Sequence, residues 1–323
     1  MANTDLSNFH KPVLPSFFDG TDLRPEGLSR EQIDFFRQNG FISGVPVLNY
    51  RQLGLLREEL ALLMDPSLPP NPLFYEFHHN ESSDPETVLF HALGAWRISP
   101  GFHDLVFLRL IVKIAEQLLG GPVRLWHDQV FVKPPRDGAV VEWHQDYSYW
   151  TRTKPVAHLT CWIGLDDSTE DNGCLRYVRG SHNWDLLPRY HLSSDMSAVY
   201  KYLTDEQRAE FDPVPALLQA GQASFHHPLM LHGSYENTSN RMRRAAVVNF
   251  VRDGVTSDSD QPLLDGVPVI YRPVRRSKDS SFRSYRNKVL DNLTRAVSHR
   301  KTDILPINHK KLTLEEICIF LES

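Results

Sequence analysis

The stretch QASFHHPLMLHGSYENTSNRMRRAAVVNFVR (residues 222–252) decides the fold class of this chain. It contains three short apolar-rich runs, at 222–227, 229–234 and 244–252, which turn-forming residues separate. Runs of this kind are typical of β-strands, and no helical segment fits between them. Strands joined in this way favour an antiparallel sandwich or jelly roll over a parallel α/β sheet.

The same strand pattern extends upstream as far as Gly121. Runs rich in Val, Ile, Phe, Trp and Thr recur there and alternate with turn signals. A jelly roll needs about this number of short strands. The further strand candidates are 123–133, 140–147, 157–166 and 173–179.

The segment before Gly121 shows helical patterns instead. Ser29 to Gln32 fits a capping box, and the helix that follows ends at Gly40. Apolar periodicity predicts two more helices, from about Tyr50 to Asp65 and from Asp104 to Leu119. Residues 66–90 are rich in Pro, Asn, Ser and His, which predicts a long surface loop or lid.

Composition excludes several classes of protein. Hydrophobic residues make up 41% of the 323 residues, which suffices for a large core, but no stretch approaches the ~18 apolar residues of a membrane span. The first residues have neither a basic nor an apolar signal region, so we expect no secretory signal. Three cysteines without CxxC spacing argue against a disulfide framework and favour a cytoplasmic location.

Charge is distributed unevenly along the chain. The net charge is −5, but the window 272–311 carries 12 Lys and Arg against 3 Asp. Such a segment can contact anionic partners, yet a solvated tail is the simpler expectation. The acidic remainder argues against nucleic-acid binding.

Metal-ligand residue types stand at two places in the strand region. His144 and Asp146 lie two residues apart in the candidate 140–147, so their side chains share one face. His232 follows at the junction of two later candidates. Two imidazoles and one carboxylate are the facial triad of non-haem Fe(II) oxygenases, which leaves positions open for a cosubstrate and O₂.

Arg243 lies eleven residues after His232, immediately before the last strand candidate. It shares a face with Ala245, Val247 and Asn249, a mostly apolar set that predicts an inward direction. A guanidinium grips a carboxylate through two parallel hydrogen bonds, which suits a dicarboxylate such as 2-oxoglutarate. Because Arg241 and Arg244 are close in sequence, spacing alone does not decide which of the three arginines binds this carboxylate.

Three motifs carry a resemblance to a known family. WHQDYSYW (143–150), DNGCLRYVRGSH (171–182) and HPLMLHGSYENTSNRMRRA (227–245) resemble the phytanoyl-CoA dioxygenase family of Fe(II)/2-oxoglutarate oxygenases, over roughly residues 30–275. The resemblance implies a mainly β fold with flanking helices: a double-stranded β-helix, or cupin-like jelly roll. We therefore expect an oxygenase domain over 1–275, helical to about residue 120 and with its jelly-roll core at about 121–255. Residues 276–323 would be a basic tail of unknown role, with a short amphipathic helix at Leu314, Ile317, Cys318 and Leu321.

The resemblance also implies roles for individual residues. His144, Asp146 and His232 match the metal ligands, and Arg243 matches the residue that binds the far carboxylate of 2-oxoglutarate. Other matched positions are Ser234 as a second contact to that carboxylate, Trp162 beside the cosubstrate and Gln129 in the pocket wall.

The function expected from these residues is hydroxylation of a small organic molecule. Fe(II), 2-oxoglutarate and O₂ would be required, with release of succinate and CO₂. A halogenase is disfavoured because Asp146 fills the position that a chloride would need, and a nucleic-acid demethylase is disfavoured by the acidic body. A jelly roll that binds a metabolite or metal without catalysis remains the alternative, and the sequence does not determine the oligomeric state.

For the remaining candidate residues, the sequence allows both a structural and a functional role. His226 and His227 are expected in a core or ligand-supporting role, whereas the other histidines are expected to be structural or exposed. The aromatic residues after the metal strand, Tyr147, Tyr149 and Trp150, could equally belong to the core or line the substrate pocket. The nearby Arg152 and Lys154 could equally contact an anionic substrate or lie in a surface loop.

Overall fold

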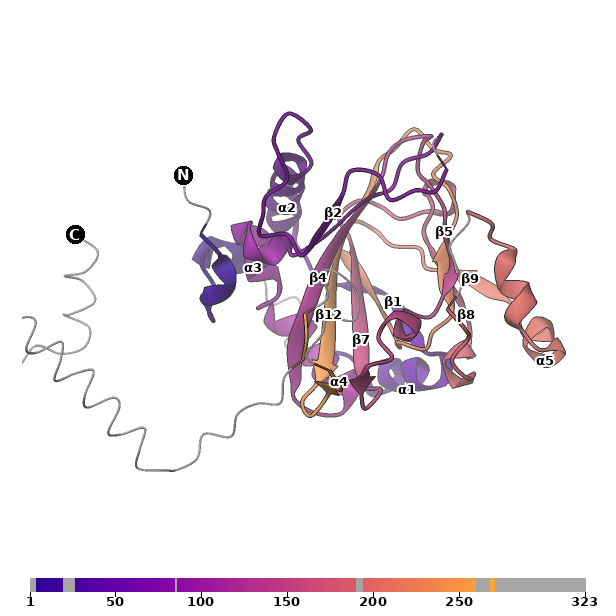
Figure 1. Ribbon diagram of the computed structural model, residues 1–323. Coiled ribbons are helices and arrows are strands. Elements are labelled where there is room, and N and C mark those ends of the chain that lie inside the picture. The colour runs from indigo at the N-terminus through magenta and orange to yellow at the C-terminus, as the bar shows by residue number, and fades with distance from the viewer. Residues whose placement is uncertain (1–3, 20–26, 85, 190–193, 260–267, 271–323) are drawn as a thin grey trace, which may run out of the picture. The chain divides into compact units, whose positions relative to one another are not determined.

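A computed structural model describes residues 4–19, 27–84, 86–189, 194–259 and 268–270 (Figure 1). All of them belong to one compact unit, Met1–Arg272. The predicted basic tail, including its amphipathic helix, lies outside the described residues. The predicted domain boundary near residue 275 therefore stays a prediction.

A seven-stranded antiparallel sheet forms one wall of the molecule. Its strand order is β1-β10-β7-β12-β4-β3-β2, and its longest pair joins β12 to β4, from Arg243 opposite Lys133 to Arg252 opposite Val123. The strands are β1 (Phe41–Pro46), β2 (Glu76–His78), β3 (Phe90–Leu93), β4 (Val123–Lys133), β7 (His158–Gly164), β10 (Gln222–His226) and β12 (Arg243–Arg252).

A four-stranded antiparallel sheet forms the opposite wall, as Figure 1 shows. Two facing antiparallel sheets confirm the predicted jelly roll. The strands of this sheet, in order, are β5 (Val141–His144), β11 (His232–Ser234), β8 (Leu175–Val178) and β9 (Pro213–Pro215), and a separate pair consists of β6 (Thr153–Lys154) and β13 (Thr256–Ser257).

Strand β12 contributes side chains to two clusters, one between the two sheets and one beneath the helices. Ala245 and Val247 point between the sheets and pack in one cluster with Trp162. Ala246 and Val248 point to the other face and pack in the cluster that the helices cover. The two-residue period of a strand places the polar cavity and the main apolar core on opposite faces of one sheet.

Helices cover the outer face of the larger sheet. Leu56 and Leu60 of α2 and Ile111 and Ile114 of α4 are fully buried in the core beneath it. Each side chain contributes about 1.5–3 kcal/mol through burial. None of the described helices is long and apolar enough to cross a membrane. The helices on this side are α1 (Arg30–Asn39), α2 (Tyr50–Leu63), α3 (Pro100–Leu105) and α4 (Arg109–Leu119), whereas α5 (Asp205–Ala209) lies on the side of the smaller sheet (Figure 1).

The first two predicted helices are confirmed, although α2 ends at Leu63 rather than near Asp65. Ser29 and Gln32 form the predicted capping box of α1, and Gly40 ends it at φ +82°, a left-handed conformation that glycine adopts without steric cost. Asn49 and Gln52 form a second capping box that begins α2.

The single helix predicted over Asp104–Leu119 is wrong. The chain forms α3 and α4 with a break between Leu105 and Arg109, and α3 begins earlier, at Pro100. The Asp104 carboxylate accepts hydrogen bonds from the backbone N–H groups of Val13 and Leu14, so tertiary contacts hold α3. No proline or glycine marks the break, which local patterns therefore cannot reveal.

The surface loop predicted over 66–90 is also partly wrong. Strand β2 lies inside it, and β3 begins at its last residue, where both extend the larger sheet. Strands β1 and β9 had no counterpart among the predicted strands, whereas β4 has the predicted bounds. The candidate at 140–147 shortens to β5, which ends at His144.

Candidate active site

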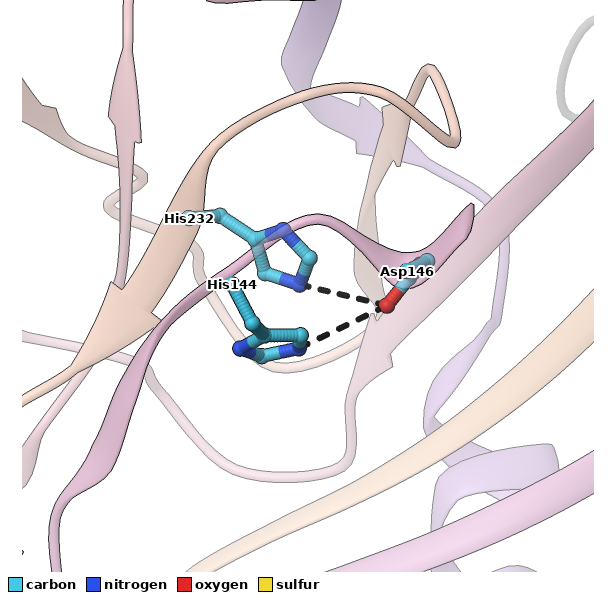
Figure 2. Close-up of side chains that lie close together, drawn as sticks. All are labelled: His144, Asp146 and His232. Carbon is cyan, nitrogen blue, oxygen red and sulfur yellow. Dashed lines mark ion pairs between the residues drawn. The ribbon is translucent and has the colours of Figure 1, made fainter. Parts of the chain in front are cut away.

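The three predicted metal ligands lie close together, two of them on paired strands of the smaller sheet. His144 ends β5 and His232 begins β11, and the two residues are direct cross-strand partners. Their Nε2 atoms lie 3.5 Å and 3.6 Å from Asp146 Oδ1, as the dashed lines in Figure 2 show. The ligand atoms of all three residues lie within 4.8 Å of one another. A single metal ion can therefore contact all three.

Asp146 reaches this position by a route that differs from the prediction. It is the first residue of a 3-10 helix, Asp146–Tyr149, rather than part of the strand. Gln145, between His144 and Asp146, keeps an extended backbone and points its side chain away from the metal ligands. Its side-chain amide donates to Leu229 O and accepts from Leu187 N. The predicted common direction of His144 and Asp146 is thus correct, although the strand ends before Asp146.

Backbone carbonyls orient both imidazoles. His144 Nδ1 donates to Glu142 O at 2.7 Å, and His232 Nδ1 donates to Met230 O at 2.9 Å. A ring that donates through Nδ1 keeps its lone pair on Nε2, the atom that faces Asp146. Such support of ligand histidines is typical of metal sites.

Asp146 has a second set of partners behind it. Its Oδ2 accepts hydrogen bonds from Thr160 Oγ1 at 2.7 Å and from His226 Nε2 at 3.1 Å. Burial acts to raise the pKa of Asp146, but His232, His144 and His226 outweigh it and hold that pKa well below its usual range. The carboxylate is therefore ionised and available to a cation. The expected supporting role of His226 agrees with this contact.

Arg243 is buried at the inner end of β12. Its Nη1 donates to Gly173 O at 2.6 Å, and its guanidinium lies 5.3 Å from the centre of the Trp162 ring. Its Nε is buried without a hydrogen-bond partner among the described residues. Burial lowers the pKa of Arg243 to about 10, so it remains charged at neutral pH.

The two neighbouring arginines point elsewhere. Arg241 is exposed and pairs with Asp171, and Arg244 forms two 2.8 Å contacts with Asp166 outside the cavity. Arg243 alone of the three lines the cavity. The strand face deduced from the sequence is therefore correct, while the role of Arg243 stays a prediction.

Lys133 is a site residue that the sequence reasoning missed. It is fully buried on β4 opposite Arg243, and its Nζ donates to Ser234 Oγ at 2.7 Å. The signal was present in HDQVFVKPP, because Lys133 shares the strand face of Gln129. The cross-strand pairing that brings it to Arg243 had no local signal.

The metal-ligand cluster and Arg243 line one cavity of about 890 Å³. Its wall includes the predicted Trp162, Ser234 and Gln129 and also His91, which the sequence reasoning missed. His91 Nε2 lies 2.9 Å from Gln129 Oε1, and its Nδ1 lies 2.7 Å from Glu81 Oε2.

The aromatic residues after the metal strand divide between two roles. Tyr149 and Trp150 line the cavity, whereas Tyr147 donates its hydroxyl to Thr153 O in a buried cluster. Arg152 and Lys154 do not line this cavity, and Arg152 lies 3.4 Å from Asp258. Their proposed contact with an anionic substrate therefore has no support here.

A second group of potential ligand atoms lies at the cavity wall. It consists of Glu76, His78 and Glu81, of which Glu81 is exposed. His78 Nε2 already lies 2.6 Å from Glu76 Oε1. Exposed acidic groups often cluster without a metal, so this arrangement is a weaker candidate than the buried triad.

Comparisons with known proteins agree with this geometry. The family model described as Phytanoyl-CoA dioxygenase (PhyH) matches residues 36–245. L-proline trans-4-hydroxylase of Streptomyces griseoviridis is 31% identical over 217 residues, which cover 58% of this chain and 80% of that protein. A probable alpha-ketoglutarate-dependent hypophosphite dioxygenase of Stutzerimonas stutzeri is 31% identical over 152 residues, or 46% of this chain. The chain spans about half the length of that second relative, 51%.

Solved structures show the same fold. The non-heme alpha ketoglutarate dependent carbocyclase SnoK from nogalamycin biosynthesis superposes with a TM-score of 0.61 at 24% identity, covering 72% of this chain and 88% of that chain. EctD from S. alaskensis, solved with 2-oxoglutarate and 5-hydroxyectoine, gives a TM-score of 0.60 at 19% identity, covering 76% and 84%.

Proposed function

Since the chain belongs to the phytanoyl-CoA dioxygenase family, we propose that it is an Fe(II)- and 2-oxoglutarate-dependent dioxygenase. It hydroxylates a small organic molecule and releases succinate and CO₂. The observation that carries this proposal is the position of the His144, Asp146 and His232 cluster in the same cavity as a buried, uncompensated Arg243.

The donor set fits Fe(II). Two neutral imidazole nitrogens and one carboxylate oxygen on one side leave the other positions of a six-coordinate ion open. The Nδ1 contacts of His144 and His232 fix the ring orientation that ligation needs. Bound there, Fe(II) supplies the activation of O₂ and the oxidation of a substrate C–H bond.

The other end of the cavity fits the cosubstrate. The unpartnered Nε of Arg243 is an orphaned donor that a carboxylate of 2-oxoglutarate satisfies. The Ser234 hydroxyl lines the same cavity and supplies a second donor, and the Trp162 ring stacks beside the guanidinium. These residues bind and orient the cosubstrate, while the buried walls exclude water from the reacting centre.

The size of the cavity limits the substrate. A volume of about 890 Å³ lies within the ~300–1,000 Å³ range of small-molecule sites. Part of it is taken by the metal and the cosubstrate, so the remaining space suits a compact molecule. Tyr149 and Trp150 form an aromatic part of the wall beside the triad.

The proposed location is the cytoplasm. Cys161 and Cys174 are free, buried thiols. Reduced cysteines are typical of cytosolic proteins.

The proposal is tested by 2-oxoglutarate turnover. Purified protein loaded with Fe(II) is supplied with 2-oxoglutarate and a metabolite extract, in air and under nitrogen, and succinate is quantified. Succinate formed only in air and only with Fe(II) supports the dioxygenase. A protein that binds 2-oxoglutarate but forms no succinate in any extract is the non-catalytic binding protein instead.

A further inference from the structure

We propose that Lys133 is a positioning residue for the cosubstrate. It holds the Ser234 hydroxyl so that the hydroxyl hydrogen points into the cavity, toward the distal carboxylate of 2-oxoglutarate beside Arg243. This inference rests on the proposed function, because it assigns a task in binding the same cosubstrate.

The hydrogen bonds of Lys133 carry the first step. Its Nζ donates to Ser234 Oγ at 2.7 Å and to Tyr235 O at 2.5 Å. An ammonium group only donates, so the Ser234 oxygen must accept, and the hydroxyl hydrogen must be directed elsewhere. No described residue accepts that hydrogen, and Ser234 lines the cavity. A ligand oxygen is the partner that this geometry leaves available.

The charges carry the second step. Lys133 and Arg243 are direct cross-strand partners, and both are buried. In the described part of the chain, no carboxylate lies within 4.0 Å of either group, whereas Arg244 next along β12 is paired with Asp166. Two like charges opposite one another in a sheet destabilise it, and buried charges need a counter-ion.

The pKa of Lys133 reflects this excess of buried positive charge. Burial and the nearby Arg243 charge hold the pKa of Lys133 well below its usual value. A carboxylate bound by Arg243 and the Ser234 hydroxyl opposes this effect, because a nearby negative charge stabilises the charged ammonium. The pair therefore favours a 2-oxo acid with a second carboxylate over one that has a single carboxylate.

The packing around Lys133 keeps its side chain in place. A Cβ atom at Gly138 would lie 2.7 Å from Lys133 Cβ, and one at Gly173 would lie 3.3 Å from Nζ. Glycine at both positions provides the space that the lysine occupies. Because the same Gly173 carbonyl accepts from Arg243, the two cations share one rigid support.

The test is the affinity of Lys133→Met for 2-oxoglutarate, because methionine keeps the length and removes the charge. Calorimetric titrations are performed with Fe(II)-loaded protein under nitrogen, so no turnover is needed. We expect affinity to fall roughly ten- to a hundredfold, as for loss of a charge-assisted hydrogen bond. Affinity for 2-oxobutyrate, which has no distal carboxylate, should change less than about threefold, and exposed Lys201→Met is the matched control.

A double-mutant cycle separates positioning from a general structural role. If Lys133 acts through the Ser234 hydroxyl, adding Lys133→Met to Ser234→Ala should reduce the affinity for 2-oxoglutarate little further. If the two residues act independently, the losses in binding free energy should add. Thermal unfolding without 2-oxoglutarate should be unchanged or raised in Lys133→Met, because a buried charge repulsion is removed. Additive losses in the cycle overturn the inference.

The outcomes distinguish this inference from the proposed function. Wild-type protein that binds no 2-oxoglutarate overturns both. Wild-type binding with equally tight binding by Lys133→Met overturns the inference alone. Should Lys133→Met fail to fold, Ser234→Ala decides instead: unchanged affinity for 2-oxoglutarate contradicts the role of the hydroxyl.

Discussion

Replacing Arg243 with methionine separates its contribution to binding from its contribution to stability. Burial lowers the pKa of Arg243 to about 10, well below its usual value, which corresponds to about 3 kcal/mol of destabilisation of the charged form. The substitution also removes the bond to Gly173 O and the contact with Trp162, each worth roughly 1–3 kcal/mol. These effects largely offset one another, so the free energy of unfolding without cosubstrate should change by less than about 3 kcal/mol.

Binding of 2-oxoglutarate should respond very differently. Removing one partner of a buried ion pair costs about 3–5 kcal/mol, which is roughly a 10²- to 10⁴-fold loss of affinity. Calorimetric titration measures the affinity, and chemical denaturation measures the stability. Arg241→Met is the matched control, because Arg241 is exposed and pairs with Asp171. Affinity within about threefold of wild type, or unfolding of the Arg243 variant, would refute the reasoning.

Three further predictions follow from the same structure. Asp146→Ala should retain the fold but lose Fe(II)-dependent succinate formation to below about 1% of wild type, and substantial turnover would remove Asp146 from the metal site. His158 is neutral because burial lowers its pKa to about 3, so wild-type stability should fall as the pH drops from about 6.5 toward 3. His158→Phe should reduce this slope by up to about 1.4 kcal/mol per pH unit in denaturation curves, and an unchanged slope counts against the assignment. Truncation after Val274 keeps the buried Ile270 and should preserve 2-oxoglutarate decarboxylation, whereas an insoluble product would show that the tail belongs to the fold.

The parts of the fold that could be predicted depend on local patterns. Strands β4 and β12 are long apolar runs between turn signals, so the bounds of β4, all but the first residue of β12 and the inward face of Arg243 followed from the sequence. The metal cluster followed from two residues in one motif and a histidine in another. His144 and Asp146 are close together in sequence, whereas His232 lies far along the chain and was assigned because its motif resembles that of a known family.

The parts that could not be predicted depend on long-range pairing. Lys133 becomes a site residue through its register with Arg243, which lies on a distant strand. His91 and Glu81 reach the cavity because β3 joins the sheet beside β4, within a segment whose Pro, Asn and Ser content is typical of loops. The break before α4 has no local signal, since the contacts of Asp104 with the N-terminal segment hold α3.

The position of bound iron is the most direct test of the proposed metal site. Crystals grown with Fe(II) and 2-oxoglutarate under nitrogen can be measured by anomalous diffraction at the iron edge. We expect one strong iron peak in contact with His144 Nε2, Asp146 Oδ1 and His232 Nε2, with 2-oxoglutarate extending from the iron to Arg243. No peak at that position, or iron bound instead at the cluster that includes Glu81, would contradict it.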